Sequence, residues 1–260
     1  MSQIRKQSLI SSLVVYIGFA IGFFNTYLFT REGGFTKAEY GLIGVFMAVA
    51  NIMFCVANLG MPSYIHKFYP YDNENLPPKK NDQLTWALFF SLFGFCLVII
   101  AGILFKDLVI RKYGTSAPDL VKYYYYIFPF GMGLTLFAIL EAYAWQVKKS
   151  VFSNFLREIQ FRVFTTILIV LSFTGFIASF DLFIKIYSFT FLAVAAILLG
   201  YLVYNNKIFF TFSVSRVSKK FFKKIVTLLS FVYGGSLVFT VSQVFDTIGI
   251  AAALDDGLGL

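Results

Sequence analysis

The sequence is short of charged residues and contains very little cysteine. Only 13% of its 260 residues are charged, whereas a soluble globular chain is typically about 25% charged. Too few polar residues remain to cover a water-soluble particle of this size, and this excludes a soluble domain. The two cysteines, Cys55 and Cys96, lie far apart in apolar stretches. Neither a disulfide framework nor a cysteine metal cluster is therefore indicated.

Motifs for enzymatic chemistry are also lacking. The chain has one histidine, and it contains no GxSxG, HExxH, GxGxxG or phosphate-loop sequence. We therefore expect no enzymatic activity, no cofactor and no metal ion. The net charge of +9 does not point to nucleic acid, because basic residues of membrane proteins collect in cytoplasmic loops. No nucleic-acid partner is expected.

Apolar and aromatic residues are abundant instead. Hydrophobic residues make up 58% of the chain, including 34 Phe and 16 Tyr. A helical membrane span needs about 20 apolar residues, and open strands cannot satisfy their backbone groups in hydrocarbon. The sequence therefore predicts an all-α membrane protein, a polytopic helical bundle. The expected spans are residues 9–30, 41–62, 84–105, 121–144, 160–180, 182–204 and 225–250.

The distribution of Lys and Arg predicts the orientation of these spans. With the N-terminus inside, fifteen basic residues face the cytoplasm and seven face outward. The inner set is Arg5, Lys6, Lys67, Lys79, Lys80, Lys148, Lys149, Arg157, Arg162, Lys207, Arg216, Lys219, Lys220, Lys223 and Lys224. The outer set is Arg31, Lys37, Lys106, Arg111, Lys112, Lys122 and Lys185. The positive-inside rule then places the N-terminus in the cytoplasm.

Several uncharged and acidic polar residues fall at membrane depth. Asp246 lies in the last expected span, and Gln243 precedes it by three residues on the same helical face. Asn51 and Asn58 are aligned in the second span, and Asn25 lies in the outer half of the first. Such groups either form hydrogen bonds between helices or line a water-filled path for a polar substrate.

Charged and small residues mark further positions. We expect Glu141 near the inner end of the fourth span and Arg162 near the inner end of the fifth, either snorkelling to the inner surface or lining the same path. Gly18 and Gly22 are four residues apart in the first span, which allows another helix to approach closely.

A basic segment precedes the last expected span. Residues 213–224 interleave lysine and arginine with apolar residues. Either this segment lies as an amphipathic helix on the anionic inner leaflet, or it is an ordinary positive-inside loop. Its position also suggests a connector between two lobes.

Residues 35–70, FTKAEYGLIGVFMAVANIMFCVANLGMPSYIHKFYP, resemble the polysaccharide-exporter branch of the multidrug/oligosaccharidyl-lipid/polysaccharide (MOP) flippase superfamily. The similar pieces are Glu39-Tyr40-Gly41 and Asn58-Leu59-Gly60-Met61. Relatives usually have an acidic residue where this chain has Asn58. A second similarity is Phe245-Asp246-Thr247, since family members often carry an Asp in the first helix of their second lobe.

The resemblance implies a MATE-like fold of two six-helix lobes joined by a basic cytoplasmic connector. Residues 1–206 would form the N-terminal six-helix lobe, 207–224 the connector, and 225–260 the first helix of the second lobe. The abrupt end after this helix suggests that the 260 residues are the N-terminal part of a longer protein.

The function that the resemblance implies is that of a flippase in the bacterial inner (cytoplasmic) membrane. It would move polyprenyl-diphosphate-linked oligosaccharide repeat units during the biosynthesis of lipopolysaccharide (O-antigen) or another surface polysaccharide, by alternating access. Expected partners are this lipid-linked oligosaccharide, membrane lipid and other polysaccharide-assembly membrane proteins. The central cavity would include Asn25, Asn51, Asn58, Gln243 and Asp246. Basic residues at the inner mouth, namely Lys67, Arg157 and Arg162, would attract the anionic head group.

Two alternatives remain open. A multidrug or toxin exporter of the same superfamily often carries acidic residues in its first lobe, and the first three spans here contain none at depth. A membrane enzyme that polymerises or ligates repeat units generally needs a large outward loop. The longest one here, about residues 106–120, is short and has only Asp107 and Asp119 as acids.

Overall fold

The structure is a computed structural model that describes the backbone of residues 3–115 and 117–257 and the side chains of residues 9–115, 117–240 and 242. It is 83% helical, and no strand occurs in the described part of the chain. Because a helix satisfies its own backbone hydrogen bonds, this architecture suits a chain surrounded by hydrocarbon. The predicted all-α membrane protein is confirmed at this level.

Six helical segments among the described residues are long and apolar enough to cross a membrane: Leu9–Thr30, Lys37–Ala57, Pro78–Leu104, Tyr124–Gln146, Phe180–Tyr204 and Arg216–Thr240. They lie in α1 (Gln3–Thr30), α2 (Lys37–Ala57), η1 and α4 (Pro78–Lys80, Gln83–Leu104), η2 and α7 (Tyr124–Tyr126, Ile127–Gln146), α10 and α11 (Phe180–Tyr187, Thr190–Tyr204), and α12 (Arg216–Gly257). Six of the expected spans therefore correspond to membrane-length helices.

The fifth expected span, residues 160–180, differs from the structure. Here the chain is helical from residue 150 to 173, through α8 (Ser150–Phe155), the π-helical η3 (Leu156–Gln160) and α9 (Phe161–Phe173). This run is long enough for a span, but Arg157, Glu158 and Arg162 interrupt its apolar character. The helix starts earlier than expected. It ends before Gly175, whose φ of 82° lies in the left-handed region, a conformation common just after a helix C-terminus.

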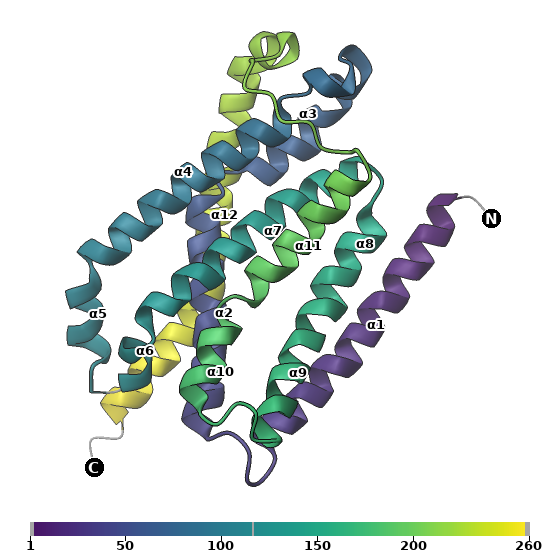
Figure 1. Cartoon of the computed structure of the whole chain (residues 1–260). Helices are drawn as coiled ribbons and strands as arrows, with labels where there is room; N and C mark the ends of the chain where they lie inside the picture. Colours follow the sequence, from purple (N-terminus) through teal and green to yellow (C-terminus); the bar gives the residue numbers. More distant parts are fainter. Residues whose placement is uncertain (1–2, 116, 258–260) are drawn as a thin grey trace.

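Shorter helices occupy the two ends of the bundle (Figure 1). The N-terminal start of α1, the helix α3 (Met61–Asn75), the α7–α8 turn and the segment before α12 lie at one end, which we term the connector end. The α1–α2 loop, α5 (Lys106–Tyr113), α6 (Pro118–Lys122) and the α9–α10 turn lie at the other. Successive connections between the membrane-length helices thus lie at alternate ends of the bundle, as the expected spans require.

The basic segment before the last span is partly helical. Helix α12 begins at Arg216 and continues without a break into the expected seventh span. The predicted connector is residues 207–224. Its last part, residues 216–224, is therefore the beginning of a membrane-length helix rather than a loop.

The boundary between α2 and α3 has a local cause. Leu59 and Gly60 have φ values of 49° and 76°, in the left-handed region. Asn58 stabilises this turn, because its Oδ1 accepts a hydrogen bond from the Gly60 N–H at 2.7 Å and its Nδ2 donates to the Phe54 carbonyl at 2.8 Å. The turn redirects the chain, so that α3 lies beside α12 at the connector end.

Helix α7 is the centre of the bundle and packs against α2, α3, α4 and α11. Its Phe130 and Phe137 are at most 1% exposed. Glycines allow the closest approaches: a methyl group on Gly133 would overlap the Leu192 backbone nitrogen on α11. Similarly, a methyl group on Gly94 of α4 would overlap the Ala57 carbonyl oxygen of α2. Small residues of this kind drive helix packing in membranes.

The outer surface is strongly apolar. Large hydrophobic side chains such as Tyr16, Phe23, Phe176 and Phe231 are each at least 74% exposed. Exposed apolar area on this scale is not found on soluble monomers, and lipid is the solvent that covers it favourably. The multi-pass membrane character predicted from composition is confirmed at the level of the helices and their surface.

We predict that Gly94→Ala destabilises the protein, because the added methyl group forces α4 away from the Ala57 backbone. The expected loss is about 1–3 kcal/mol of unfolding free energy, measured by chemical or thermal unfolding in detergent. Gly200→Ala on α11 is the control, since nothing lies within 4 Å of the added methyl group. It should be neutral or stabilising by up to about 1 kcal/mol. Equal effects of the two variants would contradict this packing.

Candidate functional site

The start of α12 is held against α4 by the carboxylate of Asp82. Oδ2 of this carboxylate accepts a hydrogen bond from the Ser215 N–H at 2.8 Å, and its Oδ1 accepts from the Ser218 hydroxyl at 3.1 Å. Ser215 in turn caps the helix, since its Oγ accepts from the Ser218 N–H at 3.0 Å. Asp82 is fully buried, and a carboxylate is favourable at a helix N-terminus.

Helix α3 joins the same hydrogen-bond network. The hydroxyl groups of Tyr64 and Ser218 lie 3.4 Å apart. Tyr64 is 5% exposed, and burial raises the pKa of its phenol. Helix α12 therefore meets α3 and α4, which lie far earlier in the sequence, at the connector end around one carboxylate.

A cleft of about 510 Å³ lies between α3 and α12. We term it the cationic cleft, and its lining residues are Lys67, Phe68, Tyr71, Phe221, Lys223, Lys224, Thr227, Leu228 and Phe231. Three of them are lysines and none is acidic. An aromatic ring supports one of these charges, since the Lys224 Nζ lies 5.6 Å from the Phe221 ring centroid.

The cationic cleft has the chemistry of an anion site. Its three lysines come from two different helices, so an anion bound in the cleft would interact with positive charge from both. The Thr227 hydroxyl adds a hydrogen-bond donor. A phosphate or diphosphate group suits this arrangement better than a cation or a neutral molecule.

The predicted basic residues Arg157 and Arg162 lie in a different place. Together with Glu141 and Glu158 they form a chain of ion pairs, which we term the charge ladder. The distances are 3.0 Å from Arg157 to Glu141, 3.1 Å from Arg157 to Glu158 and 2.9 Å from Arg162 to Glu158. Each arginine is therefore neutralised by an acidic neighbour, unlike the lysines of the cationic cleft.

Glu141 lies near the inner end of α7, as predicted, whereas Arg162 lies farther along its helix than the sequence suggested. Arg162 is at the middle of the helical run of residues 150–173, about 18 Å from its start. Its neighbours Arg157 and Glu158 lie in the π-helical turn η3, and π-helical turns occur frequently at functional sites. Charges at such depth require partners, and the ladder supplies them.

Helix α1 is fastened to the ladder by small and polar residues. The Arg162 side chain lies against Gly18 and Gly22, where a methyl group on Gly18 would overlap the guanidinium. Asn25 is 6% exposed; it donates to the Arg162 carbonyl at 2.9 Å and accepts from the Thr166 hydroxyl at 2.6 Å. Both Asn25 and the two glycines therefore serve the packing of α1 against α9.

The two asparagines of α2 have different surroundings. Asn58 is 5% exposed and holds the turn into α3. Asn51 is exposed, and its Nδ2 donates to the Met47 carbonyl at 2.9 Å. Gln243 and Asp246 lie on α12, but their side chains are outside the described residues. The predicted cavity residues on α1 and α2 are thus not brought together, and their role in a cavity stays a prediction.

No protein-family model, curated protein or solved structure matches this chain. The case for function therefore depends on the residues of the site.

Of the three basic residues predicted at the inner mouth, Lys67 lies in the cationic cleft and the two arginines lie in the charge ladder. Sequence reasoning did not assign Lys223 and Lys224 to the site. The sequence feature that could have indicated them is helical spacing, since Lys223 and Lys224 precede Thr227 by four and three residues and so lie on the same side of the helix.

A buried carboxylate lies close to the network. Asp72 of α3 is 1% exposed, and neither carboxylate oxygen has a hydrogen-bond partner among the described residues. Burial, and then the negative charge of nearby Asp82, raise the pKa of Asp72 to about 7.

We predict a strong coupling between Glu141 and Arg157. Glu141→Ala removes one of the two carboxylates that pair with Arg157, the other being Glu158. It should cost about 1–3 kcal/mol of unfolding free energy, whereas the double variant with Arg157→Ala should recover about 1–2 kcal/mol of this loss. The exposed pair Asp181–Lys185 is the control, with an expected coupling below about 1 kcal/mol. Additive effects of Glu141→Ala and Arg157→Ala would contradict the ladder.

We also predict a pH-dependent effect at Asp72. Because the pKa of its carboxyl group is raised from 3.8 to about 7, the folded protein binds this proton more tightly than the unfolded chain. Its contribution to stability is therefore lost as the pH rises from about 4 to about 7. Asp72→Asn should be more stable than the unaltered protein at about pH 8, and the gain should vanish near pH 4. The same comparison with Glu74→Gln, an exposed residue of α3, should show no such trend; a gain for Asp72→Asn that is constant with pH would contradict the prediction.

Proposed function

We propose that this chain is part of a flippase that moves polyprenyl-diphosphate-linked oligosaccharide repeat units across the bacterial cytoplasmic membrane. The observation that carries the proposal is the cationic cleft, whose lining includes Lys67, Lys223 and Lys224 and no acidic residue. The substrate couples an anionic diphosphate to a long hydrocarbon chain. A cationic site at the end of a membrane-spanning bundle fits such a molecule.

The sequence resemblance of residues 35–70 to polysaccharide exporters supports the same proposal. In that fold, the described helices up to α11 form the first lobe and α12 begins the second. The cleft lies where α12 meets α3 of the first lobe, so a bound head group contacts both lobes. Alternating access by rocking of the lobes would then change the cleft itself.

The two sets of basic residues would have different roles. Each arginine of the charge ladder forms an ion pair with a carboxylate within the protein, so the ladder offers little net charge to a substrate. The lysines of the cleft attract the diphosphate from the cytoplasm, the side on which the positive-inside rule places the connector end. The flippase would act in the assembly of lipopolysaccharide or another surface polysaccharide.

The test is the pool of polyprenyl-linked oligosaccharide in cells with the gene disrupted, with lectin access reporting its sidedness. We expect complete repeat units to accumulate on the cytoplasmic side. An unchanged pool would leave drug export as the better function, and repeat units stranded on the outer side would indicate a polymerase or ligase.

Complementation with variants tests the cleft itself. The triple variant Lys67→Gln, Lys223→Gln, Lys224→Gln should lower the export rate at least about tenfold, because each lysine contributes about 1 kcal/mol to binding an anionic group at the membrane surface. The control is the triple variant Lys79→Gln, Lys80→Gln, Lys220→Gln, which removes the same charge from exposed positions outside the cleft. Equal loss of export in both triple variants would show that net charge, rather than the cleft, matters.

A further inference from the structure

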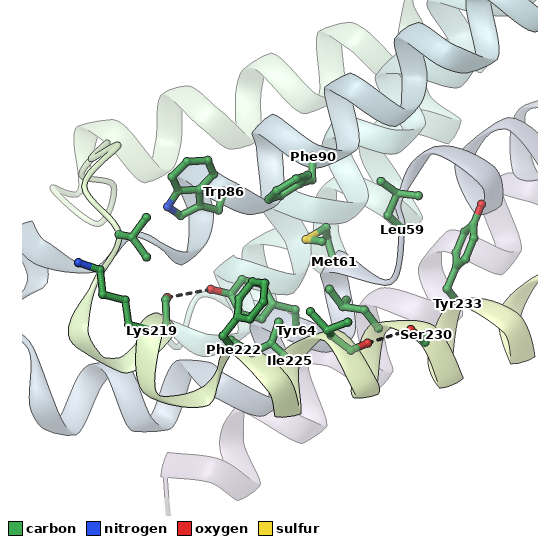
Figure 2. Close-up of a pocket in the computed structure, with 14 residues that line it drawn as sticks. Leu59, Met61, Tyr64, Trp86, Phe90, Lys219, Phe222, Ile225, Ser230 and Tyr233 are labelled. Atoms are coloured by element: carbon green, nitrogen blue, oxygen red, sulfur yellow. Dashed lines mark hydrogen bonds between the residues drawn. The ribbon is translucent and has the colours of Figure 1, made fainter.

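A second cavity lies on another face of α12. This apolar groove has a volume of about 840 Å³ and runs between α12, α3 and α4. Figure 2 shows the residues that line it: Leu59, Met61, Tyr64, Trp86, Phe90, Val214, Ser218, Lys219, Phe222, Ile225, Val226, Leu229, Ser230 and Tyr233. The groove is mostly apolar, since most of these side chains are aliphatic or aromatic.

The hydroxyl groups in the wall already have partners within the protein. The Ser230 hydroxyl donates to the Val226 carbonyl at 3.0 Å, and the Tyr233 hydroxyl donates to the Val56 carbonyl at 3.1 Å. Ser218 and Tyr64 belong to the Asp82 network. Trp86 Nε1 is buried without a hydrogen-bond partner among the described residues. Apart from it and Lys219, the wall offers its ligand an apolar surface, on which a polar molecule would lose its hydration without compensation.

A single charged residue marks one end of the groove. Figure 2 shows Lys219 at one end and Tyr233 at the other, a separation of about 21 Å along α12. Lys219 is exposed and forms no ion pair with a described side chain. A long apolar groove with one cation at its membrane-surface end matches a hydrocarbon chain that ends in an anionic group.

We propose that this groove binds the hydrocarbon chain of the polyprenyl phosphate carrier, with its phosphate at Lys219. The inference rests on the proposed function, which supplies the carrier as the lipid that must stay in the bilayer while its head group crosses. Charge complementarity favours a phosphate lipid over a neutral one. The cationic cleft is a separate site, lined by other residues of the same helix α12.

The chain contains a built-in reporter for this groove. Of its two tryptophans, Trp86 lines the groove, whereas Trp145 donates to the Ser153 hydroxyl at 3.1 Å on α8 and lies outside it. In a Trp145→Phe background, the emission of Trp86 therefore reports what occupies the groove. Lipids with brominated chains quench tryptophan on contact, and a ligand that displaces them restores the emission.

The experiment places the full-length Trp145→Phe protein in bilayers of brominated phosphatidylcholine and adds polyprenyl phosphate. We expect the emission of Trp86 to recover. Polyprenol, which lacks the phosphate, and phosphatidylglycerol, which lacks the polyprenyl chain, should each need at least about fivefold more lipid for the same recovery. No recovery with polyprenyl phosphate, or equal recovery with phosphatidylglycerol, would overturn the proposal.

Matched variants locate the effect. Lys219→Gln should weaken the recovery about fivefold, whereas Lys220→Gln, an adjacent exposed lysine outside the groove, should not. Ser230→Phe fills the groove and should weaken recovery at least about tenfold. Val238→Phe adds the same ring at a position that is 72% exposed and outside the groove, and it should behave as the unaltered protein. Equal effects within either pair would also overturn the proposal.

The groove and the flippase can fail separately. If Trp86 reports carrier binding but gene disruption leaves the oligosaccharide pool unchanged, the groove stands and the proposed function fails. If disruption strands repeat units inside the cell but Trp86 does not respond to the carrier, the function stands and the groove inference fails.

Discussion

The carboxylate of Asp82 accepts hydrogen bonds from the first turn of α12, and both cavities of the connector end depend on that contact. The cationic cleft and the apolar groove lie on different faces of α12. Helix α3 forms the other wall of the cleft, and α3 and α4 form the other walls of the groove. A buried carboxylate that satisfies two donors is costly to remove, because Ser215 and Ser218 would then lose their partner. Asp82 thus fixes the position of the helix that shapes both sites.

The charges of the protein fall into two classes with different physical roles. Within the bundle, the arginines of the charge ladder are paired with glutamates at 2.9–3.1 Å, as the cost of a lone charge at membrane depth requires. At the connector end, the lysines of the cleft have no acidic residue in their lining. The first class holds α1 and α7 to the helical run of residues 150–173, and the second lines a cleft without an acidic residue.

Composition and apolar run length were sufficient to predict the helical membrane bundle and six of its spans. They failed at residues 160–180, because the helix there begins at Ser150 and carries Arg157 and Glu158 within its length. The close approach at Gly18 and Gly22 was predicted, but its partner, the Arg162 side chain, was not. Nor did the sequence show that Glu158 forms ion pairs with both arginines, since this depends on side-chain directions in the π-helical turn η3.

The candidate site was less predictable than the fold. Lys67 was recognised from its place at the inner end of a span, whereas its proximity to Lys223 and Lys224 depends on how α12 crosses α3. That crossing follows from the Asp82 contact and the left-handed turn at Leu59 and Gly60, neither of which leaves a periodic pattern in the sequence. For Gln243 and Asp246, the role in a cavity remains a prediction.

The most direct measurement is the transbilayer movement of a polyprenyl-diphosphate-linked oligosaccharide in liposomes that contain the purified full-length protein. Access of an external lectin to the sugar would be followed over time, with protein-free liposomes as the reference. The account predicts that the protein makes the lectin-inaccessible pool accessible, and that a phosphatidylcholine probe does not move faster. Equal rates with and without the protein would contradict the central claim.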